Sequence, residues 1–133
     1  MEQRDIIYAA GIFDGEGCTG VYRNRKGYYF IQAVVSNTNL ELLEWFAQRL
    51  GGNVSNKIYW TGNRKGYYQW SCSGLRALAF LREIQPYSIV KRKIIEVVLQ
   101  FPTTGSGKRC SYETKLKLSY LYEQTKQINH RGL

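Results

Sequence analysis

Apolar and polar residues repeat with two different periods along the chain, and these periods predict alternating helices and strand pairs. Apolar residues spaced three or four apart are typical of helices, whereas runs of β-branched and aromatic residues with alternating polarity are typical of strands. The predicted helices cover residues 5–13, 38–50, 75–84, 90–101 and 111–127, and the predicted strands cover residues 18–25, 28–35, 53–60 and 67–73. Two hairpins, each followed by a helix, predict an α+β domain in which helices cover one face of a four-stranded antiparallel sheet.

The ends of the first two predicted helices are marked by capping and turn residues. Asp5 is the predicted N-cap of the first helix, which is expected to end at the glycines that start with Gly15. Thr38 and Glu41 have the spacing of a capping box at the start of the second helix, and Gly51 follows its last turn. Because no stretch of the chain has the composition of a linker, a single domain of residues 1–133 is expected.

Alternation along the predicted strands separates an inward face from an outward face. The positions expected to face the helices are Val21, Ile31, Ala33, Val35, Val54, Ile58, Tyr68, Trp70 and Cys72. The positions expected to face outward are Tyr22, Asn24, Tyr28, Phe30, Gln32, Ser55, Lys57, Tyr59, Tyr67, Gln69 and Ser71. Their polar groups can hydrogen-bond to base edges, and a β-ribbon fits the major groove, so the outward set is a candidate DNA-binding surface. An ordinary polar sheet surface would have the same pattern, and that alternative stays open.

The balance of charged residues indicates the class of partner that the chain binds. The chain has 19 Lys and Arg against 10 Asp and Glu, a formal net charge of +9. No carboxylate occurs between residues 17 and 40 or between residues 45 and 82, the segments that contain both predicted hairpins. A cationic surface of this kind indicates a polyanionic partner, most commonly nucleic acid, although a merely solvated basic surface would have the same composition.

A six-residue repeat occupies the tips of both predicted hairpins. Residues 24–29, Asn-Arg-Lys-Gly-Tyr-Tyr, recur as residues 63–68. Asn and Gly favour turns, which explains part of the repeat, but a turn does not require the adjacent basic pair. We therefore expect the basic residues of both copies to contact the phosphates of a DNA backbone; they are Arg25, Lys26, Arg64 and Lys65.

Composition disfavours several functional classes. The three cysteines form no Cys-x-x-Cys pair and the only histidine is His130, which argues against a zinc site and a histidine-based triad. No apolar run approaches the roughly 20 residues of a membrane span, and the charged first residues are unlike a secretory signal. An intracellular protein with reduced thiols is therefore expected, without an indication of its compartment and with no membrane as partner.

The segment of residues 9–17, Ala-Ala-Gly-Ile-Phe-Asp-Gly-Glu-Gly, combines small residues with two closely spaced carboxylates. Small side chains allow a second helix to approach closely. Glu16, just beyond the predicted helix end, meets the negative end of the helix dipole and would be stabilised by a cation. If two such helices pack side by side, a divalent metal relieves the repulsion between their carboxylates, and main-chain carbonyls add oxygen ligands. Alternatively, the small residues ease core packing, and Asp14 and Glu16 are solvated.

This segment resembles the LAGLIDADG motif, with Gly15 and Glu16 at positions that commonly vary. Residues 37–40, 50–52, 85–93 and 128–132 are similar to further segments of that family, so the resemblance covers nearly the whole chain. It implies the αββαββα fold of the family with extra C-terminal helices. It also implies a site-specific homing endonuclease that makes metal-dependent double-strand breaks with short 3′ overhangs in double-stranded DNA.

Because the chain contains one motif, the resemblance implies a homodimer that binds a palindromic or nearly palindromic site. The dimer would pack through the first helix. The residues expected at this interface are Ile7, Ala10, Gly11 and Asp14.

The resemblance also implies the active-site residues. Glu16 and the main-chain carbonyl of Gly15 would bind Mg²⁺, and Mn²⁺ or Ca²⁺ can take its place. Lys91 would stabilise charge in the transition state or assist the attacking water, and Asn37 would organise solvent near the metal.

Three further positions are considered for the active site, and none is assigned as a main catalytic residue. Lys93 is a fallback for the role of Lys91. Glu41 stands near the turn where the family usually has another basic group, so a second basic contributor is not assigned. Asp14 is expected to brace the helix end rather than to bind metal.

Two alternatives without nuclease activity stay open. One is a nucleic-acid-binding module of the same fold that does not cleave DNA, such as a maturase that binds intron RNA, or a regulator. The other is a dimeric interaction protein, which would leave the acid-free basic sheet unexplained.

Overall fold

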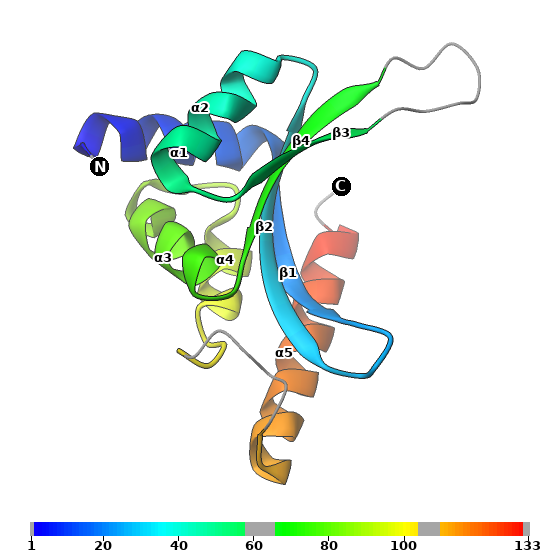
Figure 1. Ribbon diagram of the computed structural model, residues 1–133. Coiled ribbons are helices and arrows are strands. Elements are labelled where there is room, and N and C mark those ends of the chain that lie inside the picture. The colour runs from blue at the N-terminus through cyan, green and yellow to red at the C-terminus, as the bar shows by residue number, and fades with distance from the viewer. Residues whose placement is uncertain (1, 58–65, 104–109, 132–133) are drawn as a thin grey trace.

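The computed structural model describes residues 2–57, 66–103 and 110–131, and its elements follow the predicted order (Figure 1). They are α1 (Gln3–Glu16), β1 (Gly17–Arg23), β2 (Tyr29–Asn37), α2 (Leu40–Leu50), β3 (Asn53–Lys57), β4 (Tyr67–Ser73), α3 (Gly74–Ile84), the short 3₁₀ helix η1 (Gln85–Tyr87), α4 (Arg92–Val98) and α5 (Tyr112–Arg131). Among the described residues, no helix is both long and apolar enough to cross a membrane. The predicted α+β class is confirmed.

The four strands form one antiparallel sheet in the order β1-β2-β4-β3. The register pairs apolar residues across every strand boundary: Val21 with Ile31, Ala33 with Cys72, and Trp70 with Val54. Because opposed residues share one face of a sheet, the apolar positions of all four strands gather on the side that α1 to α4 cover in Figure 1. The predicted inward and outward faces are thereby confirmed for the described strand residues, while Ile58 and Tyr59 lie outside them.

A cluster of aromatic side chains joins this sheet to three helices. The ring of Phe80 in α3 lies 5.3 Å from that of Phe13 in α1 and 5.2 Å from that of Trp70 in β4. Phe46 of α2 lies 5.0 Å from Trp70, and the indole nitrogen of Trp70 donates a 2.8 Å hydrogen bond to the carbonyl of Gly51. Complete burial of each of these side chains contributes about 1.5–3 kcal/mol. The cluster therefore fixes the C-terminal half of α1 relative to the sheet.

The last helix, α5, lies along the free edge of β1 (Figure 1). The N–H of Val21 donates to Thr125 Oγ1 over 3.1 Å, and Asn129 Nδ2 donates to the carbonyl of Thr19 over 3.1 Å. Leu118 is fully buried on the same helix. Thus α5 satisfies polar backbone groups on an edge strand that would otherwise be open to another strand.

Both predicted ends of α1 are wrong. The N-cap is Glu2 rather than Asp5, and the helix continues through Gly15 to Glu16, with Gly17 as its C-cap. A glycine that keeps helical geometry costs about 1 kcal/mol relative to alanine and does not by itself end a helix. The helix ends one residue before β1 begins, so Glu16 is the last helical residue.

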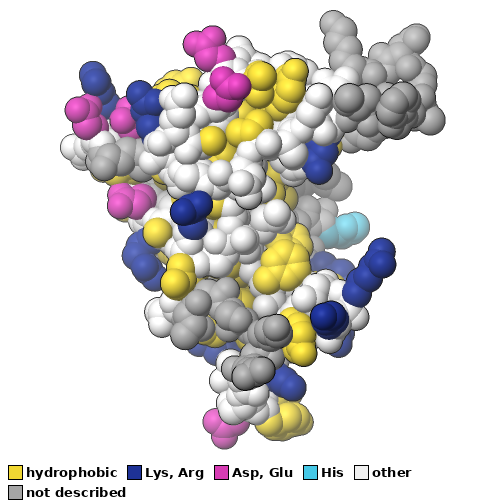
Figure 2. Space-filling view, viewed as in Figure 1, with side chains coloured by type: hydrophobic (Ala, Val, Ile, Leu, Met, Phe, Trp, Pro, Cys, Tyr) yellow, Lys and Arg dark blue, Asp and Glu magenta, His cyan; other side chains and the backbone are white. Residues whose placement is uncertain are grey.

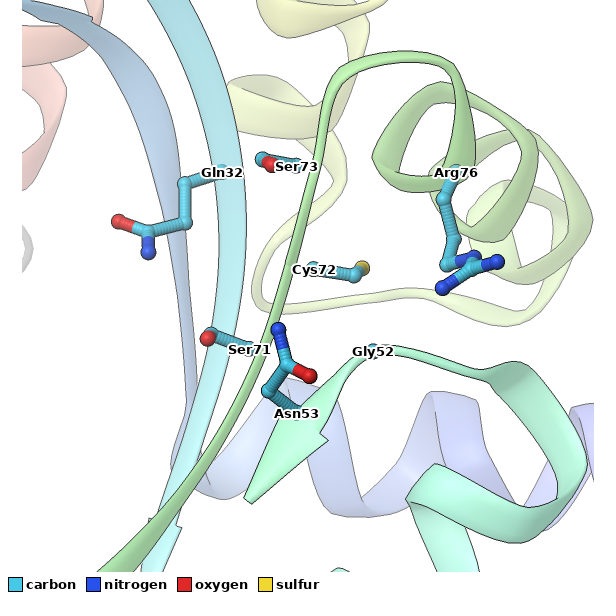
Figure 3. Close-up of a pocket in the computed structure, with 7 residues that line it drawn as sticks. All are labelled: Gln32, Gly52, Asn53, Ser71, Cys72, Ser73 and Arg76. Atoms are coloured by element: carbon cyan, nitrogen blue, oxygen red, sulfur yellow. The ribbon is translucent and has the colours of Figure 1, made fainter. Parts of the chain in front are cut away.

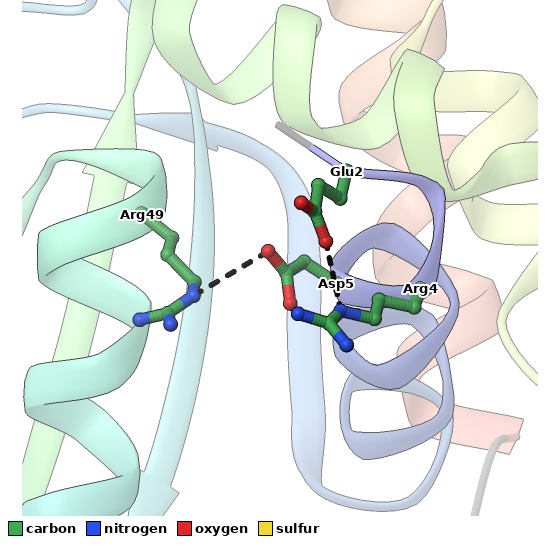
Figure 4. A network of polar contacts seen from close by, with 4 residues as sticks. All are labelled: Glu2, Arg4, Asp5 and Arg49. Carbon is green, nitrogen blue, oxygen red and sulfur yellow. Dashed lines mark ion pairs between the residues drawn. The ribbon is translucent and has the colours of Figure 1, made fainter.

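Surface charges join α1 to α2 near the N-terminus. Asp5 forms an ion pair with Arg49 of α2, with 3.5 Å between Oδ2 and Nε, and Glu2 pairs with Arg4 over 2.8 Å (Figure 4). The guanidinium of Arg49 also lies over the ring of Trp45, 4.9 Å from its centroid. Ion pairs this exposed contribute little to stability. The rings of Tyr8 in α1 and Trp45 in α2 also meet edge to face, with 5.0 Å between their centroids.

The start of α2 differs from the predicted capping box. Asn39, not Thr38, is the N-cap, and its Oδ1 accepts from the N–H of Leu42 over 3.2 Å. The helix ends as predicted at Gly51 and Gly52, which have φ values of 73° and 87°. A Cβ on Gly52 would lie 2.5 Å from the carbonyl oxygen of Ser71, so only glycine fits there.

The bounds of the last two helices also shift. Helix α4 covers Arg92–Val98 rather than residues 90–101, and α5 runs beyond residue 127 to Arg131. Ser111 caps α5 as predicted, because its Oγ accepts from the N–H of Thr114 over 3.2 Å.

Candidate active site and nucleic-acid interface

Glu16 is exposed at the junction between α1 and β1. The chain passes directly from helix to strand at Gly17, whose N–H donates to the carbonyl of Phe13. A Cβ on Gly17 would lie 2.3–2.6 Å from the ring of Phe13, so glycine is required where the chain changes direction. This close packing places the Glu16 carboxylate at the rim of the sheet.

Asn37, at the end of β2, contacts Glu16 directly. Its Nδ2 donates a hydrogen bond to Glu16 Oε2, and its Oδ1 accepts from the N–H of Asn39 over 2.8 Å. Since both ends of the amide are engaged, the side chain is fixed in one orientation. The structure therefore brings together two of the three predicted catalytic residues, although they are 21 positions apart in the sequence.

Asp14 contacts a distant segment of its own chain. Its Oδ2 accepts from the N–H groups of Ile89, at 2.8 Å, and Val90, at 3.2 Å, and its Oδ1 accepts from the N–H of Lys91, at 3.1 Å. The expectation that Asp14 braces a helix end is met at the start of α4, not at the end of α1. Its carboxylate is therefore engaged within its own chain, and its place at the dimer interface stays a prediction.

Lys91, the third predicted catalytic residue, is the half-buried N-cap of α4. Its backbone is tied to Asp14, which is two residues from Glu16. The predicted catalytic residues thus come from the end of α1, the end of β2 and the start of α4. Lys93 and Glu41, the two neighbouring positions considered from the sequence, are exposed.

The exposed side of α1 carries two open glycines. An added Cβ at Gly11 or Gly15 would meet no atom within 4 Å, and Ile7 on the same side is 47% exposed. Ala10, by contrast, is fully buried against its own chain together with Ala9. The expected interface position at Ala10 is therefore wrong, because the 3.6-residue period turns its side chain into the core.

The open face of the sheet carries the predicted outward residues. Those within the described strands are Tyr22, Phe30, Gln32, Ser55, Lys57, Tyr67, Gln69 and Ser71, and each is half-buried or exposed. Tyr28, also predicted to face outward, is half-buried and directly precedes β2. Tyr22 packs on Phe30, 5.6 Å between ring centroids. Burial, together with the neighbouring Cys18, raises the pKa of Tyr22, so its hydroxyl stays neutral at physiological pH. This face combines neutral polar groups with a lysine, and no carboxylate occurs in its four strands.

The first hairpin tip is a turn organised by Asn24. Its Oδ1 accepts from the N–H groups of Lys26, at 3.0 Å, and Tyr28, at 2.9 Å. The expected outward strand position of Asn24 is therefore wrong: β1 ends at Arg23, and the Asn24 side chain stabilises the turn. Arg25 and Lys26 are exposed as predicted for phosphate contacts. The matching residues of the second copy, Arg64 and Lys65, lie outside the described residues.

A polar hollow of about 240 Å³ opens where the sheet meets the start of α3 (Figure 3). It is lined by Gln32, Gly52, Asn53, Ser71, Cys72, Ser73 and Arg76. Asn53 and Ser73 were not among the predicted outward residues, although each is two positions from one that was, and the same alternation identifies them. Arg76 belongs to a helix and carries no strand signal.

Charge is unevenly distributed over the molecular surface. In the view of Figure 2, acidic side chains lie mainly at the left and top, with Lys and Arg side chains among them, whereas the lower right carries several Lys and Arg side chains and few acidic ones. Such a separation gives a polyanion a preferred side of approach.

No protein-family model matches the chain, and no curated protein is significantly similar to it in sequence. Solved structures are similar. The homing endonuclease I-CvuI, in complex with its DNA target in the presence of Ca, matches with a TM-score of 0.76 at 18% identity over 95% of this chain and 82% of that chain. The archaeal intron-encoded homing endonuclease I-Vdi141I, complexed with DNA, matches with a TM-score of 0.66 at 18% identity over 96% of this chain and 85% of that chain.

A third similar structure belongs to a protein named as a LAGLIDADG meganuclease. The LAGLIDADG meganuclease I-AabMI, bound to uncleaved DNA, matches with a TM-score of 0.55 at 18% identity over 69% of this chain and 33% of that chain. The chain has the LAGLIDADG homing-endonuclease fold. The predicted αββαββα arrangement with further C-terminal helices is confirmed, and residues 9–17 occupy its first helix and the start of its first strand.

The donor set at the end of α1 suits a hard divalent cation. Glu16 offers an exposed carboxylate and Gly15 a main-chain carbonyl, and such oxygen ligands favour Mg²⁺ or Ca²⁺ over zinc. Among the described residues, no group of three or more His, Cys, Asp or Glu is arranged to hold a metal. A divalent ion held at this position would receive only part of a six-oxygen shell from one chain.

Proposed function

We propose that this chain is one subunit of a homodimeric, metal-dependent endonuclease that makes double-strand breaks at a long, nearly palindromic DNA site. The observation that carries the proposal is the hydrogen-bonded pair of Glu16 and Asn37 at the end of α1, where the backbone of Lys91 is also bound to Asp14, beside an open sheet face without carboxylates.

The open face of the sheet supports DNA as the substrate. Gln32, Gln69 and Ser71 present amide and hydroxyl groups that can pair with base edges, while Arg25 and Lys26 extend the surface with positive charge suited to phosphates. The similar structures of I-CvuI and I-Vdi141I are complexes with DNA. Phosphate contacts of this kind position the protein, and the base contacts supply sequence specificity.

The open glycines of α1 support a homodimer. Glycine inside a helix costs roughly 1 kcal/mol relative to alanine, and the packing of a single chain does not require it at Gly11 or Gly15. The two residues are one turn apart on the exposed side of the helix, together with Ile7. A second copy of α1 packed on this side would explain both glycines, since their missing side chains allow two helix backbones to approach closely. It would also bring two Glu16 carboxylates near each other and complete the metal ligands.

Each of Glu16, Asn37 and Lys91 has a role in phosphodiester hydrolysis. Glu16 and the Gly15 carbonyl would hold a divalent ion, which when bound lowers the pKa of a water and stabilises the attacking and leaving oxygens. Asn37 keeps the Glu16 carboxylate in one orientation. The ammonium group of Lys91 would stabilise the extra negative charge on the phosphate as water adds and one P–O bond breaks.

Cleavage of a randomised DNA library with Mg²⁺ tests the proposal. We expect the dimer to cut a discrete set of nearly palindromic sites. Replacement of Mg²⁺ by Ca²⁺, or Glu16→Gln with Mg²⁺, is expected to leave binding within about threefold and to lower the cleavage rate more than about 100-fold, because loss of even an outer-shell partner of a metal site costs roughly 10- to 100-fold.

Three results would contradict parts of the proposal. Tight binding of DNA by the wild-type protein without cleavage would favour a module that binds without cutting. A complex containing one chain per DNA would exclude the homodimer. Loss of DNA binding in a folded Glu16→Gln variant would mean that Glu16 belongs to the binding surface rather than to the metal site.

A further inference from the structure

Asp14 makes three hydrogen bonds to a segment that lies 75 to 77 residues further along the chain. Both carboxylate oxygens are used, and all three donors are main-chain N–H groups of residues 89–91. Hydrogen bonds to an ionised carboxylate are roughly twice as strong as those between neutral groups. The end of α1 and the start of α4 are therefore joined by one side chain.

Apolar packing does not account for the position of this segment. The side chains of Ile89 and Val90 are 78% and 71% exposed, so they bury little surface. Lys91, the N-cap of α4, makes no side-chain cap hydrogen bond. Without the Asp14 carboxylate, the three consecutive N–H groups would lose their partner within the chain, and the backbone would lose its link to α1.

The remainder of the connection between α3 and α4 is held independently of Asp14. Ser88 is buried and its Oγ donates to the carbonyl of Ile84 over 3.0 Å, while Arg92 Nε donates to the carbonyl of Ser88 over 3.0 Å. Gln3 Nε2 donates to the hydroxyl of Tyr87 over 2.9 Å, at the other end of α1. Loss of Asp14 alone should therefore free the N–H groups of residues 89–91, while the Lys91 carbonyl still accepts from the N–H of Ile95 over 3.0 Å and the connection on either side stays in place.

We propose that Asp14 is a positioning residue that acts through Lys91: its carboxylate holds the Lys91 backbone at a fixed place relative to Glu16. This inference rests on the proposed nuclease activity. Two residues of one helix end then have separate roles: Glu16 would hold the metal, and Asp14 sets the place of the basic group. A displacement of about 1 Å in a catalytic group can cost roughly 100-fold in rate.

A double-mutant cycle on single-turnover DNA cleavage tests the link between Asp14 and Lys91. Asp14→Asn keeps the shape of the side chain and is expected to lower the cleavage rate by roughly 100-fold, with DNA affinity within about twofold. In the Lys91→Ala background the same change is expected to have less than about a threefold effect, because the group that it positions is already gone. Asp14→Glu, which keeps both acceptor oxygens, is expected to recover part of the rate. Glu44→Gln, an equal charge change on the exposed side of α2, is the matched control.

Amide hydrogen exchange provides a readout that needs neither metal nor DNA. The amides of Ile89, Val90 and Lys91 are expected to exchange at least about tenfold faster in Asp14→Asn than in the wild type, with Ile95 in α4 unchanged. Unchanged exchange at all three amides would overturn the structural part of the proposal. Equal rate losses from Asp14→Asn with and without Lys91 would overturn the action through Lys91. If the wild type cuts no DNA, the catalytic role fails with the proposed function, and the exchange measurement still decides whether Asp14 fixes the segment.

Discussion

At the scale of single residues, burial separates the cysteines into two chemical classes. Cys72 is 6% exposed on the inward face of β4, and burial raises its pKa to about 12 although the nearby Arg76 lowers it. Cys18 is exposed at the start of β1. Since the thiolate is the reactive form, at pH 8 we expect iodoacetamide to modify Cys18 roughly 10³-fold faster than Cys72. Peptide mass mapping over time measures both rates, and the Cys72 rate should rise with pH up to about 12. Comparable rates at pH 8 in the folded protein would show that Cys72 is not shielded as described.

The residue scale also shows the limit of reasoning from sequence. The contact between Glu16 and Asn37 was expected only through a resemblance to a family, because local patterns contain no information about contacts 21 positions apart. The hydrogen bonds of Asp14 could not be predicted, since a carboxylate in a turn and one that binds distant N–H groups have the same local sequence. Ala10 and Gly11 are both small, and only the packing of α1 shows which of them faces the core.

At the scale of elements, α1 carries glycines with opposite requirements. Gly17 has no room for a Cβ, whereas Gly11 has open space around it. Gly17→Ala is expected to lower the free energy of unfolding by about 1–3 kcal/mol through overpacking. Gly11→Ala is expected to stabilise an isolated chain by up to about 1 kcal/mol and to weaken the proposed dimer. Urea unfolding and sedimentation at several protein concentrations measure the two effects. Unchanged dimerisation in Gly11→Ala would argue against α1 as the interface.

The hydrogen bonds between α5 and the free edge of β1 give a second prediction at this scale. Thr125→Val keeps the shape of the side chain but removes the acceptor for the N–H of Val21. A buried donor without a partner costs about 1–3 kcal/mol, so the free energy of unfolding should fall by that amount. Thr38→Val, at an exposed position, is the matched control and should change stability by less than about 0.5 kcal/mol. Equal effects of the two substitutions in urea titrations would show that the hydrogen bond between Thr125 and Val21 does not contribute to the free energy of unfolding.

Element types were more predictable than element ends. The periods of apolar residues identified, in order, each α-helix and strand that the described residues form, but not the short 3₁₀ helix η1, because burial of one face imposes those periods. The ends depend on single hydrogen bonds between competing polar groups. Asn39 caps α2 in place of Thr38, and Asp5 pairs with Arg49 instead of capping α1. Neighbouring candidates of similar capping propensity cannot be distinguished without the tertiary contacts.

At the scale of the whole molecule, the proposed DNA complex predicts a salt dependence that local changes should alter. Arg25→Ala with Lys26→Ala removes two exposed charges at the first hairpin tip. The slope of log affinity against log salt is expected to become less steep by about 0.9 for each lost phosphate contact, with similar losses for all DNA sequences. Arg82→Ala on the helix layer is the control. A loss restricted to one base pair, measured by competition among site variants, would instead assign these residues to base recognition.

A four-stranded antiparallel sheet with one covered face was predictable from the sequence, but the order of its strands was not. Alternation and charge correctly separated the covered face from the open one. The order β1-β2-β4-β3 was not predicted, because α2 and β3 separate β2 from its partner β4 in the sequence, and nothing local in either strand encodes that pairing. Wherever a feature depends on two distant segments, the structure was needed to find it.

The hydrogen bonds between Val21 and Thr125 join residues 104 positions apart, so they can form only late in the synthesis of the chain. During synthesis the first hairpin leaves the ribosome long before the residues that cover its outer strand. The nascent chain therefore carries an unprotected β-edge through most of translation, the period when such edges are prone to pair with other chains. A premature stop before the last helix would leave that edge permanently open, so truncated products should be substrates for chaperones and proteases rather than partly active subunits.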